Sequence, residues 1–262
     1  MRAKKRYGQH FLQPEWADKL VAAIAPRKDD SFLEIGPGAG ALTVRLAPHV
    51  AHVTAVEVDA EMVAALRRAL PSNVTLVHAD VLDFDLADAG LPNPIRVAGN
   101  LPYNVSSPIL FKLLDDHRRR HGLVDATVML QREVADRITA SPGSGDYGVL
   151  SILTQLHCDV RRVMALPPGA FRPAPRVHSA VVNLRFRPPA VPLKDETIFA
   201  AMVRMMFTQR RKTLANALDS YAGSRRVDAG AALRHANIDP RRRPQTLQLT
   251  ELARLADYFA SS

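Results

Sequence analysis

The chain has 262 residues, which is enough for one large α/β domain or for one such domain with a small appendage. Hydrophobic residues make up 47% of the sequence, which argues against wholesale disorder, and no apolar run approaches the length of a membrane span. Lysine and arginine total 35 against 26 acidic residues, and the net charge of +9 favours nucleic acid as a partner about as much as it favours a soluble basic protein.

A β–α alternation organises most of the chain. We expect a first helix at 14–25, because a proline suits its opening turn and Trp16, Leu20 and Ile24 recur with helical spacing. Strands are predicted at 31–35, 53–58, 74–79, 95–99 and 126–131, with helices between most of them, including 61–70 and 108–116. Such alternation predicts a mainly parallel sheet with helices on both faces.

The pattern changes towards the C-terminus. Two later strands, predicted at 158–165 and 180–186 around a proline-rich connection, could form an antiparallel edge. Three prolines within 188–192 are typical of a linker. Only helical periodicity follows, near 196–207, 212–220, 228–235 and 251–259. We therefore predict an α/β domain over 1–187 and a small all-helical domain over 188–262.

A glycine-rich turn follows the first predicted strand. Gly36, Gly38 and Gly40 come directly after Glu34-Ile35, and glycines permit a tight turn and the close approach of a ligand to the backbone. The spacing is not the Gly-x-Gly-x-x-Gly of dinucleotide-binding loops, and the Glu34 carboxylate would repel a pyrophosphate. That carboxylate could instead orient a cationic or amine-bearing ligand. A plain strand-to-helix turn remains the alternative.

Polar side chains also end the next three strands. Glu57 follows Gly36 by 21 residues, close to the separation at which an acidic residue accepts the hydroxyls of a ribose. Asp80 could accept a hydrogen bond from an adenine amino group. Each could be a solvated strand-end carboxylate. With Asn100 on the fourth strand, however, they line one edge of a sheet, where open α/β sheets bind ligands.

The segment Asn100-Leu101-Pro102-Tyr103 is the most informative of the chain. The Asn100 side-chain oxygen and the Pro102 carbonyl can both accept hydrogen bonds from an exocyclic amine. The Tyr103 ring offers a face on which a base can stack. These groups indicate chemistry on the amino nitrogen of a nucleobase.

The whole pattern resembles class I methyltransferases, which use S-adenosylmethionine and have a Rossmann-like fold. It resembles in particular the bacterial 16S rRNA adenine N6,N6-dimethyltransferases. The motifs that carry this resemblance are Tyr7-Gly8-Gln9-His10-Phe11-Leu12, the loop from Glu34 to Thr43, the segment from Asn100 to Tyr103, Phe-Arg-Pro-Ala-Pro-Arg-Val-His-Ser at 171–179 and Phe-Thr-Gln-Arg-Arg-Lys-Thr-Leu at 207–214. Five motifs in this order are highly specific.

The resemblance implies roles for individual residues. The cofactor-binding set would be His10, Leu12, Gly36, Gly38, Glu57, Asp80 and Asn100. The catalytic set would be Asn100, Pro102, Tyr103 and Phe171, with the two aromatic rings on opposite faces of the target adenine. Taken without the family, Phe171 would be a hydrophobic plug under its loop. His10 departs from the asparagine that is frequent at its position, and could make a cofactor contact pH-dependent.

The expected partner is 16S rRNA within the small (30S) ribosomal subunit or its precursor. Basic residues cluster at 2–6, 118–120, 204–212, 225–226 and 241–243. Any one cluster could be a solvated face, but their recurrence in both predicted domains favours contacts with RNA phosphates. We expect no metal, because the chain has one cysteine and its histidines lack metal-ligand spacing. A monomeric, cytoplasmic protein without a membrane segment or secretory signal is expected.

Three other functions compete with this hypothesis. A 23S rRNA methyltransferase of the macrolide-resistance type would share the fold and the Asn-Leu-Pro-Tyr-like motif, but the 171–179 motif and the basic tail favour 16S rRNA. An assembly factor that holds an immature small subunit is a second possibility, and both roles could coexist. A nicotinamide-dependent oxidoreductase is disfavoured by the glycine spacing.

Overall fold

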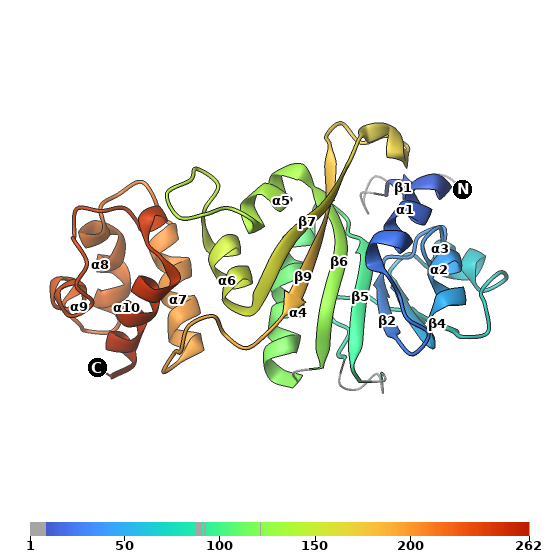
Figure 1. The fold of residues 1–262 in the computed structure, drawn as a ribbon. Helices are drawn as coiled ribbons and strands as arrows, with labels where there is room; N and C mark the ends of the chain where they lie inside the picture. The colour runs from blue at the N-terminus through green and yellow to red at the C-terminus, as the bar shows by residue number, and fades with distance from the viewer. Residues whose placement is uncertain (1–8, 87–90, 92, 121, 262) are drawn as a thin grey trace. The chain divides into compact units, whose positions relative to one another are not determined.

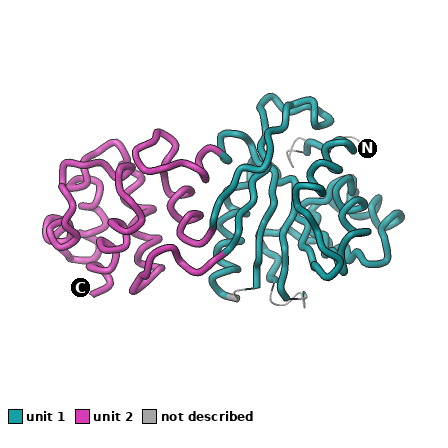
Figure 2. The backbone as a smooth tube through the Cα atoms, viewed as in Figure 1, with its two compact units in different colours: residues 1–135, 159–186 teal, residues 136–158, 187–262 magenta. Residues whose placement is uncertain are grey.

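The computed structural model describes residues 9–86, 91, 93–120 and 122–261, and it divides the chain into two compact units. Unit 1 comprises residues 1–135 and 159–186, and unit 2 comprises 136–158 and 187–262 (Figure 2). The expected boundary at 187/188 lies beside the division at 186/187, but residues 136–158 also group with the C-terminal helices. Residues 1–8, and with them Tyr7, Gly8 and the basic cluster at 2–6, lie outside the described ranges.

A seven-stranded sheet forms the framework of unit 1 (Figure 1). Its order is β4-β3-β2-β5-β6-β9-β7. The strands are β2 (Ser31–Ile35), β3 (His52–Glu57), β4 (Val74–His78), β5 (Ile95–Asn100), β6 (Leu123–Gln131), β7 (Cys158–Leu166) and β9 (Ser179–Phe186). The first five pair in parallel, whereas β9 is antiparallel to β6. The predicted parallel sheet with an antiparallel addition is therefore confirmed.

Helices and a small second sheet complete unit 1. The helices are α1 (Pro14–Ile24), α2 (Thr43–Leu46), α3 (Ala60–Leu66) and α4 (Ser106–Arg120), with short 3-10 turns η2 (Ala47–His49) and η3 (Pro168–Ala170). β1 (Phe11–Leu12) pairs antiparallel with β8 (Phe171–Arg172) across more than 150 residues of sequence. Two-residue strands leave no periodicity in a sequence, so this pair was not predicted.

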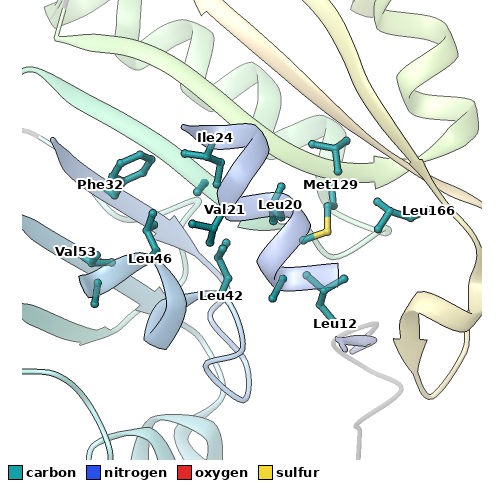
Figure 3. Packing of buried hydrophobic residues seen from close by; sticks show 14 of the residues in the cluster. Leu12, Leu20, Val21, Ile24, Phe32, Leu42, Leu46, Val53, Met129 and Leu166 are labelled. Carbon is teal, nitrogen blue, oxygen red and sulfur yellow. The ribbon is translucent and has the colours of Figure 1, made fainter. Parts of the chain in front are cut away.

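One hydrophobic cluster packs α1 and α2 against a face of the main sheet (Figure 3). Leu20, Val21 and Ile24 of α1 pack with Leu42 and Leu46 around α2. The sheet contributes one buried residue from each of six strands, namely Phe32, Val53, Ala98, Met129, Leu166 and Val181. Alternation along each strand then aims the neighbouring residues at the opposite face. The same cluster includes Leu12 and Phe171, so β1 and β8 are anchored to the core of unit 1.

Unit 2 is helical in its described residues. Its helices are α6 (Val149–His157), α7 (Glu196–Phe207), α8 (Leu214–Ser224), α9 (Ala229–His235) and α10 (Leu249–Ser261), with the 3-10 turn η4 (Pro244–Thr246); α5 (Arg132–Ile138) spans the division between the units. The Asp195 carboxylate caps α7 and the Asp228 carboxylate caps α9 by accepting backbone N–H groups. The four predicted C-terminal helices are confirmed, whereas α6 was not predicted. In the described ranges, no helix combines the length and apolarity needed to cross a bilayer.

One carboxyl group is buried at the end of β2. Glu34 is 1% exposed, and its Oε2 atom has no hydrogen-bond partner. Burial raises the pKa of Glu34 to about 7, and the nearby Glu57 charge adds to this rise while Thr43 opposes it. Since the unfolded chain loses this proton near pH 4.5, the folded state binds more protons between pH 4.5 and 7. The stabilisation of the folded state by proton binding at Glu34 is complete below pH 4.5 and is lost as the pH rises through 7.

Replacement of Glu34 by glutamine should remove this pH dependence. We expect the unfolding free energy of Glu34→Gln, relative to the unmodified protein, to increase by up to about 3 kcal/mol between pH 4.5 and pH 8. Denaturant unfolding at several pH values measures the difference. Glu15→Gln, at an exposed carboxylate of α1, is the matched control. Parallel stability curves for Glu34→Gln and the unmodified protein would refute the assignment.

Candidate functional site

A cavity opens at the carboxyl ends of β2, β3, β4 and β5. Its volume is about 160 Å³. It is lined by eight of the residues expected at the site: His10, Gly36, Gly38, Glu57, Asp80, Asn100, Pro102 and Tyr103. Parallel pairing explains this convergence, because Ile35 lies opposite Val56 on one side and opposite Gly99 on the other. The residues that follow these three positions therefore meet at one edge.

The turn after β2 depends on glycine. Gly36, Gly38 and Gly40 have φ angles of 67°, 54° and 83°, in the left-handed region that side chains rarely adopt. A Cβ atom on Gly40 would also come within 2.6 Å of the Leu66 side chain. At the other end of the turn, the Gly36 N–H donates to the Val56 carbonyl at 2.9 Å. The turn is thus held against β3 with Gly36 and Gly38 facing the cavity.

Glu57 supports this turn as well as facing the cavity. Its carboxylate accepts the Gly38 N–H at 3.0 Å and the Asp59 N–H at 2.9 Å, one on each oxygen. The residue is 6% exposed. A carboxylate has about four lone-pair sites, so two acceptor positions stay available to ligand hydroxyls. Asp80, at the end of β4, is exposed, and one of its oxygens accepts the Leu82 N–H at 2.9 Å.

The Asn100 amide has a defined orientation. Its Nδ2 atom donates to the His10 carbonyl at 2.7 Å. Because the nitrogen side is committed to this bond, the Oδ1 atom is the acceptor left for a ligand. A carbonyl oxygen at this position can receive an N–H of an amine bound in the cavity. The sequence predicted the acceptor, but the hydrogen bond that orients it comes from a residue 90 positions earlier in the chain.

Pro102 and Tyr103 continue the same wall. The Pro102 carbonyl accepts the Val105 N–H at 3.1 Å, which leaves its second lone pair for another donor. The Tyr103 hydroxyl is hydrogen-bonded to the Ser179 hydroxyl, and the ring stacks on His10 with centroids 5.6 Å apart. Burial raises the pKa of Tyr103, and the Ser179 hydroxyl partly offsets the rise. Tyr103 therefore stays neutral at physiological pH.

Two expected residues lie elsewhere. Leu12 does not line the main cavity but borders a smaller one of about 40 Å³, which it shares with Glu34, Gly36 and Asn100. Phe171 is 1% exposed and belongs to the hydrophobic cluster. In this structure Phe171 is therefore the plug under its loop, which was the alternative interpretation of this residue. To stack on a base, its ring would have to leave the core.

Other residues of the site were missed by sequence reasoning. Gln9 and Phe11 line the main cavity, and the Gln9 side chain donates to Asp59 at 2.9 Å. Both lie inside the N-terminal motif, which was the available signal. Ser179 was quoted in a motif but received no role, although its hydroxyl holds Tyr103. Only the fold brings residues 9–11, 100–103 and 179 together.

The residues present fit S-adenosylmethionine. Such a ligand needs a slot for its adenine, acceptors for its ribose hydroxyls and a backbone that permits close approach. Val58, Val81 and Leu82 give the cavity apolar walls, while the carboxylates of Glu57 and Asp80 offer the acceptors. Within the described ranges, no cluster of three or more histidine, cysteine or acidic residues could hold a metal ion.

Known proteins are similar in sequence to this chain along nearly its full length. The family model "Ribosomal RNA adenine dimethylase" matches residues 1–260. A protein of Xanthomonas euvesicatoria named "Ribosomal RNA small subunit methyltransferase A" is 43% identical over 97% of this chain and 95% of its own length. A protein of Anaeromyxobacter sp. with the same name is 45% identical over 97% of this chain and 93% of its own length.

Solved structures extend the likeness to the fold. A dimethyladenosine transferase from Plasmodium falciparum superposes with a TM-score of 0.79 at 25% identity, covering 96% of this chain and 98% of the other. The 23S rRNA methyltransferase ErmE gives a TM-score of 0.68 at 27% identity, covering 95% of this chain and 99% of the other. The predicted class I methyltransferase fold is therefore confirmed. Matched by the family model over residues 1–260, this chain belongs to the ribosomal RNA adenine dimethylase family.

Proposed function

We propose that this protein transfers methyl groups to N6 of two adjacent adenines in the 3′-terminal hairpin loop of 16S rRNA. The reaction class, adenine dimethylation in rRNA with S-adenosylmethionine as donor, follows from family membership. The relatives named for the small subunit support 16S rRNA as the target. At residue level, the proposal depends on the Asn100 amide, whose nitrogen is bound by the His10 carbonyl so that its oxygen can receive the target amine.

The chain contributes orientation and electrostatics to the transfer. S-adenosylmethionine supplies an electrophilic methyl group when it is bound. The N6 lone pair of adenine is delocalised into the ring, so the amine must be made pyramidal. Asn100 Oδ1 and the Pro102 carbonyl accept the two N6–H groups and direct the lone pair away from themselves. No strong base is needed, because the methylated amine is acidic enough to lose its proton to water.

Tyr103 holds the face of the target base. An adenine must leave its stack to reach the cavity, and a base in a loop does so at lower cost. Stacking on an aromatic ring stabilises such a base by about 1–3 kcal/mol. The bond from the Tyr103 hydroxyl to Ser179 keeps the ring in place for this contact. Phe171 is packed in the core and pairs with Leu12, so it anchors the β1–β8 pair and does not contact the base.

Unit 2 presents exposed cations that suit RNA phosphates. Backbone bonds join two basic loops, since the Leu214 N–H donates to the Arg242 carbonyl at 2.7 Å. The exposed basic residues of these loops are Arg210, Arg211, Lys212, Arg241 and Arg243. Arg242 lies between them but is paired with Glu251, so its role is internal. Arg241 is exposed but is paired with Asp239 at 3.0 Å, so we assign RNA binding to the other exposed members of this set.

The wider context of the reaction is also a proposal. We infer that the substrate is the small (30S) subunit or its precursor, and that the protein acts in the cytoplasm as a monomer. Cys158 is buried, and a single cysteine cannot form an internal disulfide, which is compatible with a reducing compartment. The likeness to ErmE makes 23S rRNA the competing substrate. Incubation of the protein and tritiated S-adenosylmethionine with unmodified small and large subunits, followed by nucleoside analysis and primer extension, distinguishes the two.

Asn100→Ala should separate catalysis from cofactor binding. We expect methyl transfer to fall about 100- to 1,000-fold, because one acceptor of the N6–H groups is lost. Affinity for S-adenosylmethionine, measured by calorimetry, should stay largely intact. If both quantities fell by the same factor, Asn100 would be a cofactor ligand and not part of the amine-binding pair.

Glu57→Ala should have the opposite profile. Charge-assisted hydrogen bonds contribute about 1.5–3 kcal/mol each, so the dissociation constant of S-adenosylmethionine should rise about 10- to 100-fold. The variant Glu57→Gln keeps one oxygen acceptor and should lie between Ala and the unmodified protein. A thermal unfolding scan separates this effect from collapse of the Gly38 turn. Unchanged affinity in Glu57→Ala would exclude the ribose assignment.

The salt dependence of RNA binding should report the exposed cations. For the double variant Arg211→Gln, Lys212→Gln, we expect the slope of log affinity against log salt to become shallower by about 1.4 to 1.8. Filter binding of small subunits between low and physiological salt measures this slope. Cofactor affinity should not change. Arg234→Gln, which removes an exposed arginine already paired with Asp228, is the control and should leave the slope in place.

A further inference from the structure

The loop between β8 and β9, residues 173–178, lies beside the main cavity. Both of its ends are fixed to residues of the cavity wall. Before the loop, Arg172 of β8 pairs with Phe11, which lines the cavity. After the loop, the buried Ser179 is hydrogen-bonded through its hydroxyl to the hydroxyl of Tyr103. The loop therefore borders the ring on which the target base is proposed to stack.

The start of α5 lies against the same loop. Strands β5 and β6 pair in parallel, so the last residues of β6 lie at the same edge of the sheet as Asn100. Gln131, at the end of β6, is opposite Ser179. Arg132 follows, and its N–H donates to the His178 carbonyl at 2.9 Å. The strand register thus brings Arg132 to the border of the cavity, although 40 residues separate it from Arg172 in the sequence.

Three exposed arginines occupy this border, and we call Arg132, Arg172 and Arg176 the rim arginines. None of them forms an ion pair with a residue in the described part of the chain. The segment 171–179 also contains no acidic residue. Elsewhere in unit 1 several arginines are paired with aspartates, namely Arg45, Arg96, Arg118 and Arg119. The rim arginines can therefore donate to an anion from outside the chain.

The loop presents its cations from a fixed backbone. Phe171 before it and Pro175 within it are buried. The Pro173 carbonyl lies 2.7 Å from Nδ1 of the His10 ring. Proline also restricts φ at two positions of the loop. A loop held in this way loses little conformational freedom when it binds a ligand, and this favours affinity. The guanidinium group itself binds phosphate through two parallel N–H bonds.

We propose that the rim arginines bind the RNA phosphates next to the target adenine and thereby hold the extruded nucleotide at the cavity. This inference rests on the proposed function and deepens it. A base that leaves its stack rotates about its own backbone, so the phosphates on either side of it come to the border of the pocket. Phosphate contacts position the RNA, while contacts inside the cavity recognise the base. The rim arginines act on the target nucleotide and its neighbours, separately from the basic loops of unit 2.

The triple variant Arg132→Gln, Arg172→Gln, Arg176→Gln tests this proposal. Glutamine keeps a polar side chain and removes the positive charge. We expect kcat/KM for methyl transfer to unmodified small subunits to fall 10- to 100-fold. The dissociation constant of S-adenosylmethionine, measured by calorimetry, should change less than threefold. If the triple variant is unstable in a thermal scan, Arg176→Gln alone, at a loop position outside any strand, should still lower kcat/KM three- to tenfold.

A second triple variant removes the same charge from the opposite edge of the sheet. Arg27, Arg67 and Arg68 are exposed and belong to unit 1, and they lie in the segments that lead into β2 and β4. Replacement of all three by glutamine should keep kcat/KM within threefold of the unmodified protein. Equal losses in the two triple variants would overturn the proposal, because net charge alone would then explain them. So would full activity without the rim arginines, or a cofactor dissociation constant that rises in parallel with the loss.

Uncharged phosphate analogues test the contact directly by binding. The probe is a synthetic RNA hairpin with two adjacent adenines in its loop, and its partner has methylphosphonate linkages on both sides of each of these adenines. By fluorescence anisotropy, we expect the unmodified protein to bind the charged hairpin 10- to 100-fold more tightly than the neutral analogue. The variant without the rim arginines should distinguish the two less than threefold.

The hairpin experiment also separates this inference from the proposed function. If both proteins lost the same factor on neutralisation, or if the unmodified protein failed to distinguish or to bind the hairpins, the role of the rim arginines would be refuted. Absence of methyl transfer to small subunits by the unmodified protein would instead refute the proposed function. The binding of the two hairpins would still decide whether the rim arginines hold phosphates.

Discussion

The spacing between β2 and β5 is the constraint on which the site depends. Gly99 of β5 lies so close to β2 that a Cβ atom would come within 2.5 Å of the Ile35 carbonyl oxygen. Only glycine is compatible with this approach, because carbon atoms of side chains do not come that near to backbone oxygen. The parallel register then places Asn100 beside the Gly36 turn. The distance between the glycine turn and the amine-binding segment is thus set by backbone packing.

The second requirement is met from the N-terminal end of the chain. Alone, the edge of the sheet supplies an Asn100 side chain free to rotate. Residues 9–13 remove that freedom, since the His10 carbonyl accepts the amide N–H and this segment is itself held by the 169–173 region. The burial of Leu12 and Phe171 in the core of unit 1 stabilises this arrangement. The orientation of the Asn100 amide is therefore maintained in part by the hydrophobic packing of Leu12 and Phe171.

Charge has two separate uses in this protein. Some arginines are structural: Arg242 donates to Glu251, and this hydrogen bond lowers the pKa of the Glu251 carboxyl, so the pair stays ionised and holds its loop against α10. Others are exposed on the same loops and belong to the surplus of positive charge counted in the sequence. A count of basic residues cannot distinguish the two kinds, because neighbouring arginines differ only in the partner that the fold brings to them. Affinity for a polyanion depends on the exposed kind alone.

Local patterns in the sequence were sufficient to predict the strands of the main sheet, most of the helices and the edge at which polar residues gather. These properties are local: apolar periodicity, glycine at a turn, and a carboxylate or amide at the end of each strand. Only the tertiary structure decided that Phe171 is buried, that α6 belongs with the C-terminal helices, and that Gln9, Phe11 and Ser179 join the site. Each of these facts depends on contacts between segments far apart along the chain. Such contacts leave no periodic pattern in the sequence, because they depend on how the whole unit packs.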